Sequence, residues 1–178
     1  MSDYGEYLDK TTFRIERLLP GPLERVWAYL TEADKRAEWF CAGEFDLRPG
    51  GRAEFHFDHR RITSADDKPP PKYEKHAGET RFDGRIVKAE PPHLLVFEWP
   101  EESGDWTEVE IRLTEESGKV RLTLTHSKLR TPQDLISISG GWHSHLDILK
   151  AKLEGATPPP FWAAIARLEP EYEKKLLA

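Results

Sequence analysis

Apolar and polar residues alternate along most of the chain, and this period of two is typical of β-strands with one buried face. The first such stretch is TTFRIERLL, and from Gly43 onward the pattern continues in GEFDLR, GRAEFHF, ETRFDGRIVKAE, HLLVFEWP, WTEVEIRL and KVRLTLTHS. Turn-forming residues separate these stretches, as in RPGG and in the pair Pro91-Pro92. The sequence therefore predicts an antiparallel sheet with one face covered and the other open to water.

Two short helices are predicted between the first strand and the rest of the sheet. GPLERVWAYLT places Pro22 at the favoured first helical position and repeats its apolar residues at helical spacing. EADKRAEWF follows and returns Trp39 and Phe40 toward the core. Strands and helices in this order predict an α+β fold.

A longer helix is predicted in GGWHSHLDILKAKLEG, residues 140–155. His143 and His145 are two residues apart, roughly 200° around the helix axis, so they cannot bind one metal ion together. Gly140 and Gly141 weaken a helix, and we interpret them as its loose start or as a place of close backbone approach. A narrow arc of the helical wheel holds Trp142, Leu146, Leu149 and Leu153. Such an arc predicts a lid that packs across the dry face of the sheet.

Two segments depart from these patterns. Residues 59–78, HRRITSADDKPPPKYEKHAG, mix both charges around three prolines and are predicted to be a mobile loop in a domain that spans residues 1–155. The extension 156–178 carries Phe161 and Trp162 and is predicted to form a short helix. That helix packs either on the domain or on a second copy of the chain. In the second case the protein would form a homodimer.

Charge and composition exclude several classes of protein. A formal net charge of −6 leaves no basic stripe for nucleic acid. The start, MSDYGEYLDK, has no apolar core of a signal peptide, and no eighteen apolar residues run together, so we expect a cytoplasmic protein without a membrane segment. The single cysteine, Cys41, fits a reducing compartment. His56 and His59 lie on opposite faces of a strand, and no zinc motif is present, so no metal is expected.

His126 is the first candidate for chemistry. Its parity is that of Leu122 and Leu124, so its side chain is predicted to point toward the covered face of the sheet. There it is either a polar anchor for a ligand or a core histidine that a neighbour satisfies. The aromatic residues of the same region likewise form either plain core or the wall of a ligand cavity.

The order of these stretches resembles the START-like, helix-grip (SRPBCC) superfamily, and most closely the branch related to the activator of the heat-shock chaperone ATPase. The matching pieces are PLERVWAYLT, Trp39, the RPGG turn with Phe55, DGRIVKAEPPHLLVFEW, and GGW with Leu146, over about residues 12–154. The resemblance implies a curved antiparallel sheet of six to seven strands wrapped around a long C-terminal helix. It also implies an apolar cavity between them and no universal catalytic residue.

Three functions follow as hypotheses. The first is binding of a hydrophobic or amphipathic small molecule in the cavity, without a cofactor. The second, implied by the resemblance, is a co-chaperone-like module that binds a chaperone or another protein, as in a stress response. The third is a cyclase or hydrolase that uses the same cavity. The residues expected to line it are Trp39, Phe55, Phe57, Phe82, Trp99, His126, Trp142, His145, Leu146 and Leu149.

Overall fold

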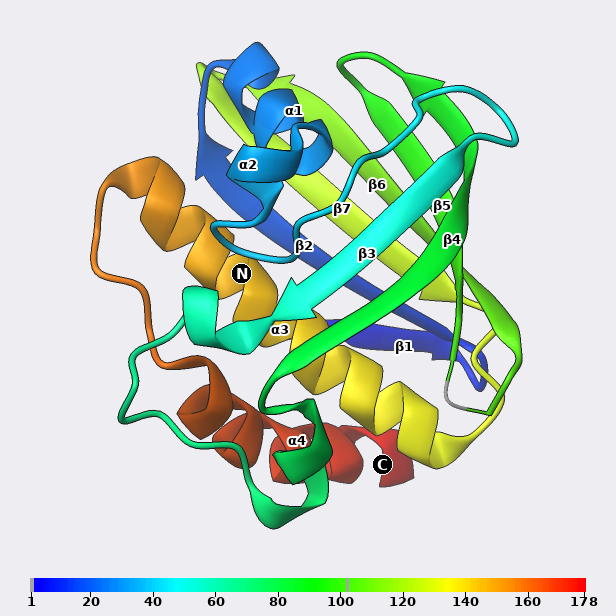
Figure 1. The fold of residues 1–178 in the computed structure, drawn as a ribbon, viewed down its shortest axis with the longest axis vertical. Helices are drawn as coiled ribbons and strands as arrows, with labels where there is room; N and C mark the ends of the chain where they lie inside the picture. Colours follow the sequence, from blue (N-terminus) through cyan, green and yellow to red (C-terminus); the bar gives the residue numbers. More distant parts are fainter. Residues whose placement is uncertain (1, 102) are drawn as a thin grey trace.

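The sheet curves around the helices, as Figure 1 shows for the computed structural model. In residues 2–101 and 103–178, which the structure describes, seven antiparallel strands pair in the order β1-β2-β7-β6-β5-β4-β3. They are β1 (Glu6–Asp9), β2 (Thr12–Pro20), β3 (Arg52–Asp58), β4 (Glu79–Glu90), β5 (Leu94–Pro100), β6 (Trp106–Glu116) and β7 (Lys119–Ser127). The alternating residues keep one parity buried: Ile111 lies opposite Leu124, and Leu113 opposite Leu122.

Four α-helices and two 3-10 helices complete the described chain: α1 (Leu23–Thr31), α2 (Ala33–Arg36), η1 (His59–Arg61), η2 (Pro71–His76), α3 (Pro132–Glu154) and α4 (Phe161–Leu177). Helix α3 runs across the open side of the curved sheet, and α4 packs along α3 (Figure 1). The α+β helix-grip fold is thus confirmed. No helix in the described part of the chain is long and apolar enough to cross a membrane.

Helix α3 begins earlier than its apolar stripe predicts. The Thr131 side chain caps it by accepting the Asp134 N–H over 3.0 Å, and Pro132 occupies the first turn. Gly155, with φ +70°, ends it in the left-handed conformation that favours glycine. Gly140 is therefore in mid-helix, where an added Cβ would lie 3.1 Å from Cγ of Glu169 on α4. The loose start is therefore wrong for the glycine pair, and a close approach is found at Gly140 alone, to a side chain of α4, since a Cβ at Gly141 would meet nothing within 4 Å.

Two strand assignments need correction. Residues 43–48 are expected to form a strand, but within the described chain they make only one isolated bridge, Phe45 to Ala53, and a second bridge joins the preceding Ala42 to His56. The backbone turns back on itself there, since the Arg48 N–H donates to the carbonyl of Asp46, and so no ladder continues. Strand β1 was not predicted, because its four residues show no alternation.

The segment 59–78, expected to be a mobile loop, lies against the start of α4. Pro160 offers this helix no side-chain cap. Instead, the Asp67 carboxylate accepts the N–H groups of Trp162 and Ala163 over 2.7 and 3.0 Å. The Thr63 hydroxyl accepts the Phe161 N–H over 3.0 Å. A carboxylate at a helix N-terminus satisfies unpaired donors and favours the helix dipole, so this segment and the extension 156–178 hold each other.

Candidate functional site

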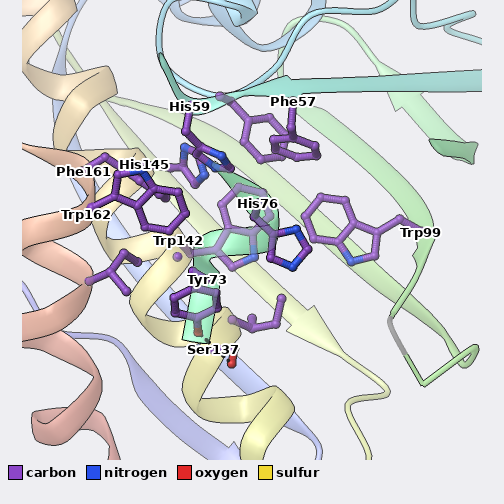
Figure 2. A pocket seen from close by; sticks show the side chains of 14 residues that line it. Phe57, His59, Tyr73, His76, Trp99, Ser137, Trp142, His145, Phe161 and Trp162 are labelled. Atoms are coloured by element: carbon purple, nitrogen blue, oxygen red, sulfur yellow. Dashed lines mark hydrogen bonds between the residues drawn. The ribbon is translucent and has the colours of Figure 1, made fainter. Parts of the chain in front are cut away.

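A cavity of about 190 Å³ lies between the sheet, α3, α4 and the segment 59–78 (Figure 2). Phe57 of β3 and Trp99 of β5 form its sheet side. Helix α3 contributes Ser137, Ile138, Gly141, Trp142 and His145. The remaining walls come from outside the sheet and α3, and they are Phe40, His59, Tyr73, His76, Phe161, Trp162 and Ile165. Most of this lining is aromatic or aliphatic, with a few polar atoms at its two ends.

Two indoles form one wall. Trp99 and Trp142 lie parallel, with ring centroids 5.7 Å apart and an interplanar angle of 2°. The Phe40 ring packs against Trp142, with ring centroids 4.9 Å apart. Offset aromatic pairs of this kind add stabilisation beyond the area that they bury, so this wall has a defined shape.

His126 lies behind that wall, fully buried. The Trp142 indole N–H donates to its Nδ1 over 3.0 Å. Since an indole N–H only donates, Nδ1 carries no proton, and Nε2 therefore donates to the Thr107 hydroxyl over 2.7 Å. Burial lowers the pKa of His126 to about 3, which keeps the ring neutral. Both of its nitrogens are used within the protein, and the ring does not line the cavity.

The second indole joins the same network. The Thr107 hydroxyl donates to Oε1 of Glu101 over 3.2 Å. The Trp99 indole N–H donates to the same carboxylate oxygen over 2.8 Å. Both tryptophans thus have their N–H groups satisfied by protein acceptors, while their rings line the cavity.

One end of the cavity carries two imidazoles. His145 Nδ1 lies 2.8 Å from the carbonyl oxygen of Trp39, and the two histidine rings, His145 and His59, have centroids 5.7 Å apart. The His59 ring stacks on Phe161, with centroids 4.6 Å apart. Burial lowers the pKa of His145 to about 3 and that of His59 to about 4, so both are neutral at pH 7.

The other end carries hydroxyl groups that join three elements. The Tyr73 hydroxyl of η2 donates to Oε2 of Glu169 on α4 over 2.8 Å and lies 3.1 Å from the Ser137 hydroxyl on α3. Lys72 places its ammonium 2.7 Å from Oε1 of Glu169. Figure 2 shows Tyr73 and Ser137 on the side of the pocket opposite His59 and His145. These contacts hold η2 across the cavity.

The cavity continues outward into a cleft of about 780 Å³. Six residues line both spaces: Phe57, His59, Tyr73, His76, Trp99 and Ser137. The cleft adds charged groups of both signs, among them Lys72, Arg81 and Asp134. A molecule could therefore place an apolar part inside and a polar part toward water.

The residues expected from the sequence are found at three depths. Phe57, Trp99, Trp142 and His145 line the cavity. Phe82 lines the outer cleft. The other five are fully buried in the core behind these walls and do not line the cavity: Trp39, Phe55, His126, Leu146 and Leu149.

Sequence reasoning missed the walls that the two irregular segments provide. The segment 59–78 supplies His59, Tyr73 and His76, and the extension supplies Phe161, Trp162 and Ile165. The usable signal was the presence of aromatic residues in stretches too polar or too rich in proline to form a core of their own. In the described residues, no group of three or more histidine, cysteine, aspartate or glutamate side chains is placed to hold a metal ion.

Comparison with known proteins matches residues 20–154 to the family described as Activator of Hsp90 ATPase homolog 1-like protein. A Bordetella parapertussis protein solved by NMR is 40% identical, with a TM-score of 0.84 over 99% of this chain and 92% of that one. CalU16 of Micromonospora echinospora is 23% identical, with a TM-score of 0.69 over 94% and 88% of the two chains. DynU16, from the dynemicin biosynthetic locus, is 20% identical, with a TM-score of 0.59 over 84% and 49%. The curated proteins give no match.

Proposed function

We propose that this chain, which belongs to the activator of Hsp90 ATPase homolog 1-like family, binds one small apolar or amphipathic molecule. The family has the fold of the START-like superfamily, and that fold is known for binding small hydrophobic molecules. The observation that carries the proposal is the aromatic cavity between the sheet, α3 and α4. Ligand sites are typically apolar hollows with a small number of placed polar groups, and this cavity has that composition.

The volume sets the size of the ligand. An apolar cavity of roughly 150 Å³ in another protein stays dry and binds benzene. At about 190 Å³, the present cavity accepts one aromatic ring with a short substituent. The adjoining cleft of about 780 Å³ leaves room for a longer or more polar portion of the same molecule.

The polar groups of the site favour binding over acid–base catalysis. A general base works best when its pKa is near the working pH. Burial holds the pKa of His145 at about 3, far below neutrality, so this imidazole is a weak base. It is nevertheless a good hydrogen-bond acceptor, which suits recognition of a ligand.

Tryptophan emission provides the test, because Trp99, Trp142 and Trp162, three of the six tryptophans, line the cavity. We expect toluene and 1-octanol to change the emission in a saturable way. Gly141→Leu should abolish the change, since a Cβ at Gly141 meets nothing within 4 Å and a leucine there fills the cavity.

Lys150→Leu is the matched control. It adds the same side chain to the same helix at a position where the lysine side chain is 45% exposed and does not line the cavity. This variant should keep the full response. A response that does not saturate, or one that persists unchanged in Gly141→Leu, would show that these molecules do not bind in the cavity.

A further inference from the structure

One hydrogen-bond acceptor in the cavity has no partner in the described structure. His145 Nδ1 lies 2.8 Å from the Trp39 carbonyl oxygen. A carbonyl oxygen only accepts, so Nδ1 carries the proton of the neutral ring and Nε2 keeps its lone pair. Nε2 has no hydrogen bond among the described residues. The buried side-chain atoms that lack a partner do not include it, so Nε2 is not fully buried. Because His145 lines the cavity, this nitrogen is accessible from there.

The acceptor is held in a fixed direction. Trp39 is 1% exposed, and its own indole N–H donates to the Tyr29 carbonyl over 2.8 Å. The Phe40 ring stacks on Trp39 and meets the His145 ring edge to face, with centroids 5.1 Å apart. The ring of His145 therefore cannot turn without breaking packed contacts, and its lone pair is organised before any ligand arrives.

His59 adds a second unsatisfied nitrogen at the same end. Its Nδ1 is buried and has no hydrogen-bond partner in the described chain. The ring is clamped between His145, with centroids 5.7 Å apart, and Phe161, with centroids 4.6 Å apart. Buried polar atoms without partners are rare in folded proteins, and here the buried Nδ1 of His59 and the cavity-accessible Nε2 of His145 belong to two imidazoles at one end of one aromatic cavity (Figure 2).

We propose that the ligand is an uncharged aromatic alcohol, of the phenol class, whose hydroxyl donates to His145 Nε2 while its ring packs against Trp142 and Phe161. This inference rests on the proposed function and specifies its ligand. A pure hydrocarbon would leave the acceptor unpaired. A carboxylate would bring negative charge to a lone pair within apolar walls, which is unfavourable.

Three probes of similar size separate these cases. 4-Ethylphenol and 4-methylanisole are isomers, and only the first has an O–H donor; 4-methylbenzoate carries an anion. In calorimetric titration of the full chain, 4-ethylphenol should bind about tenfold more tightly than 4-methylanisole, the ratio expected from one well-placed hydrogen bond. The benzoate should bind more weakly than both.

His145→Phe tests the residue itself. It should bring 4-ethylphenol down to the affinity of 4-methylanisole, a loss of about tenfold. His56→Phe is the matched control, because His56 does not line this cavity, and it should leave the ratio unchanged. A wild-type ratio near one, or a ratio that survives in His145→Phe, overturns the inference and leaves the proposed function standing. If none of the three probes binds, the proposed function fails with it.

A measurement on the unmodified chain guards against a His145→Phe variant that does not fold. In protein labelled with ¹⁵N-histidine, the unprotonated Nε2 of His145 gives a pyridine-type resonance. Adding 4-ethylphenol should shift that resonance in the direction of hydrogen bonding, and 4-methylanisole should not. A protonated Nε2 in the free protein, or identical shifts with the two isomers, would contradict the assignment.

Discussion

The Trp142 indole and the His126 imidazole are joined by a buried hydrogen bond of 3.0 Å that ties helix α3 to strand β7. Its geometry fixes the face that Trp142 turns toward the cavity. The histidine that sequence parity places under the lid helix thus holds the wall of the site. A different histidine, His145, presents to the cavity an acceptor that has no partner among the described residues.

His126→Leu should destabilise the protein by about 1–3 kcal/mol, because the buried Trp142 N–H loses its acceptor. Urea denaturation measures the free energy of unfolding. In a Trp142→Phe background, which lacks that N–H, the same substitution should cost less, and the difference is the coupling energy of the pair. An unchanged or raised stability of His126→Leu, or strict additivity, would show that this hydrogen bond does not hold the wall.

Gly141→Ala should stabilise the protein by about 0.5–1 kcal/mol, since alanine favours a helix interior and its Cβ enters open space in the cavity. Gly140→Ala is the comparison one residue away. There the Cβ lies 3.1 Å from Cγ of Glu169, which also anchors Tyr73, so part or all of the gain should be lost. Equal thermal midpoints for the two variants would contradict the described contact between α3 and α4.

Asp67→Ala should cost about 0.5–2 kcal/mol, the usual range for removal of a helix cap. It removes the carboxylate that accepts the N–H groups of Trp162 and Ala163 at the start of α4. Hydrogen exchange read by mass spectrometry should show faster exchange in residues 161–177. Asp66→Ala, at the exposed neighbour with the same charge, should leave that exchange unchanged. Equal effects of the two substitutions would rule out capping by Asp67.

Stability should fall as the pH is lowered through the range in which unfolded histidine gains its proton. Burial lowers the pKa of His126 and of His145 to about 3 in the folded protein, and that of His59 and of His143 to about 4, whereas unfolded histidine titrates near about 6.5. Below about 6.5 the unfolded chain therefore binds protons that the folded chain does not, and the free energy of unfolding declines toward pH of about 3. Each of these four rings contributes at most roughly 1.4 kcal/mol per pH unit.

Urea denaturation at about pH 7.5 and about pH 5.5 checks this dependence, since few carboxylates titrate between them. His145→Phe removes one of these four rings and should show a shallower decline. Stability that is flat over this interval, or a slope that the variant leaves unchanged, would show that these histidines are not buried and neutral as described.

The strands and the stripe of α3 were predictable because each depends on neighbours close in sequence. The alternation that places Ile111 and Leu113 on one face indicates a strand with one buried side. The helical spacing of Trp142 and Leu146 indicates the buried side of a helix. The start of α3 was also encoded in the sequence, because Thr131 is a good N-cap and Pro132 a good first residue of a helix. The prediction placed the start at Gly140 and Gly141 instead, because glycine is unfavourable inside a helix.

The closing walls of the cavity were not predictable from local patterns. Tyr73 meets Glu169 across 96 residues of sequence, and Asp67 meets Trp162 across 95. Residues 59–78 have the composition of a solvated loop, and nothing in their periodicity indicates that α4 will hold them. The site combines a sheet and helix that the sequence encodes locally with two segments placed by tertiary contacts.

A crystal structure of the protein soaked with 4-bromophenol tests the central claim most directly, because anomalous scattering from bromine locates the ligand without ambiguity. We expect one strong bromine peak inside the cavity, with the phenol oxygen within hydrogen-bond distance of His145 Nε2 and the ring against Trp142. Bromine confined to the outer cleft or the protein surface, with the cavity unchanged, would contradict it.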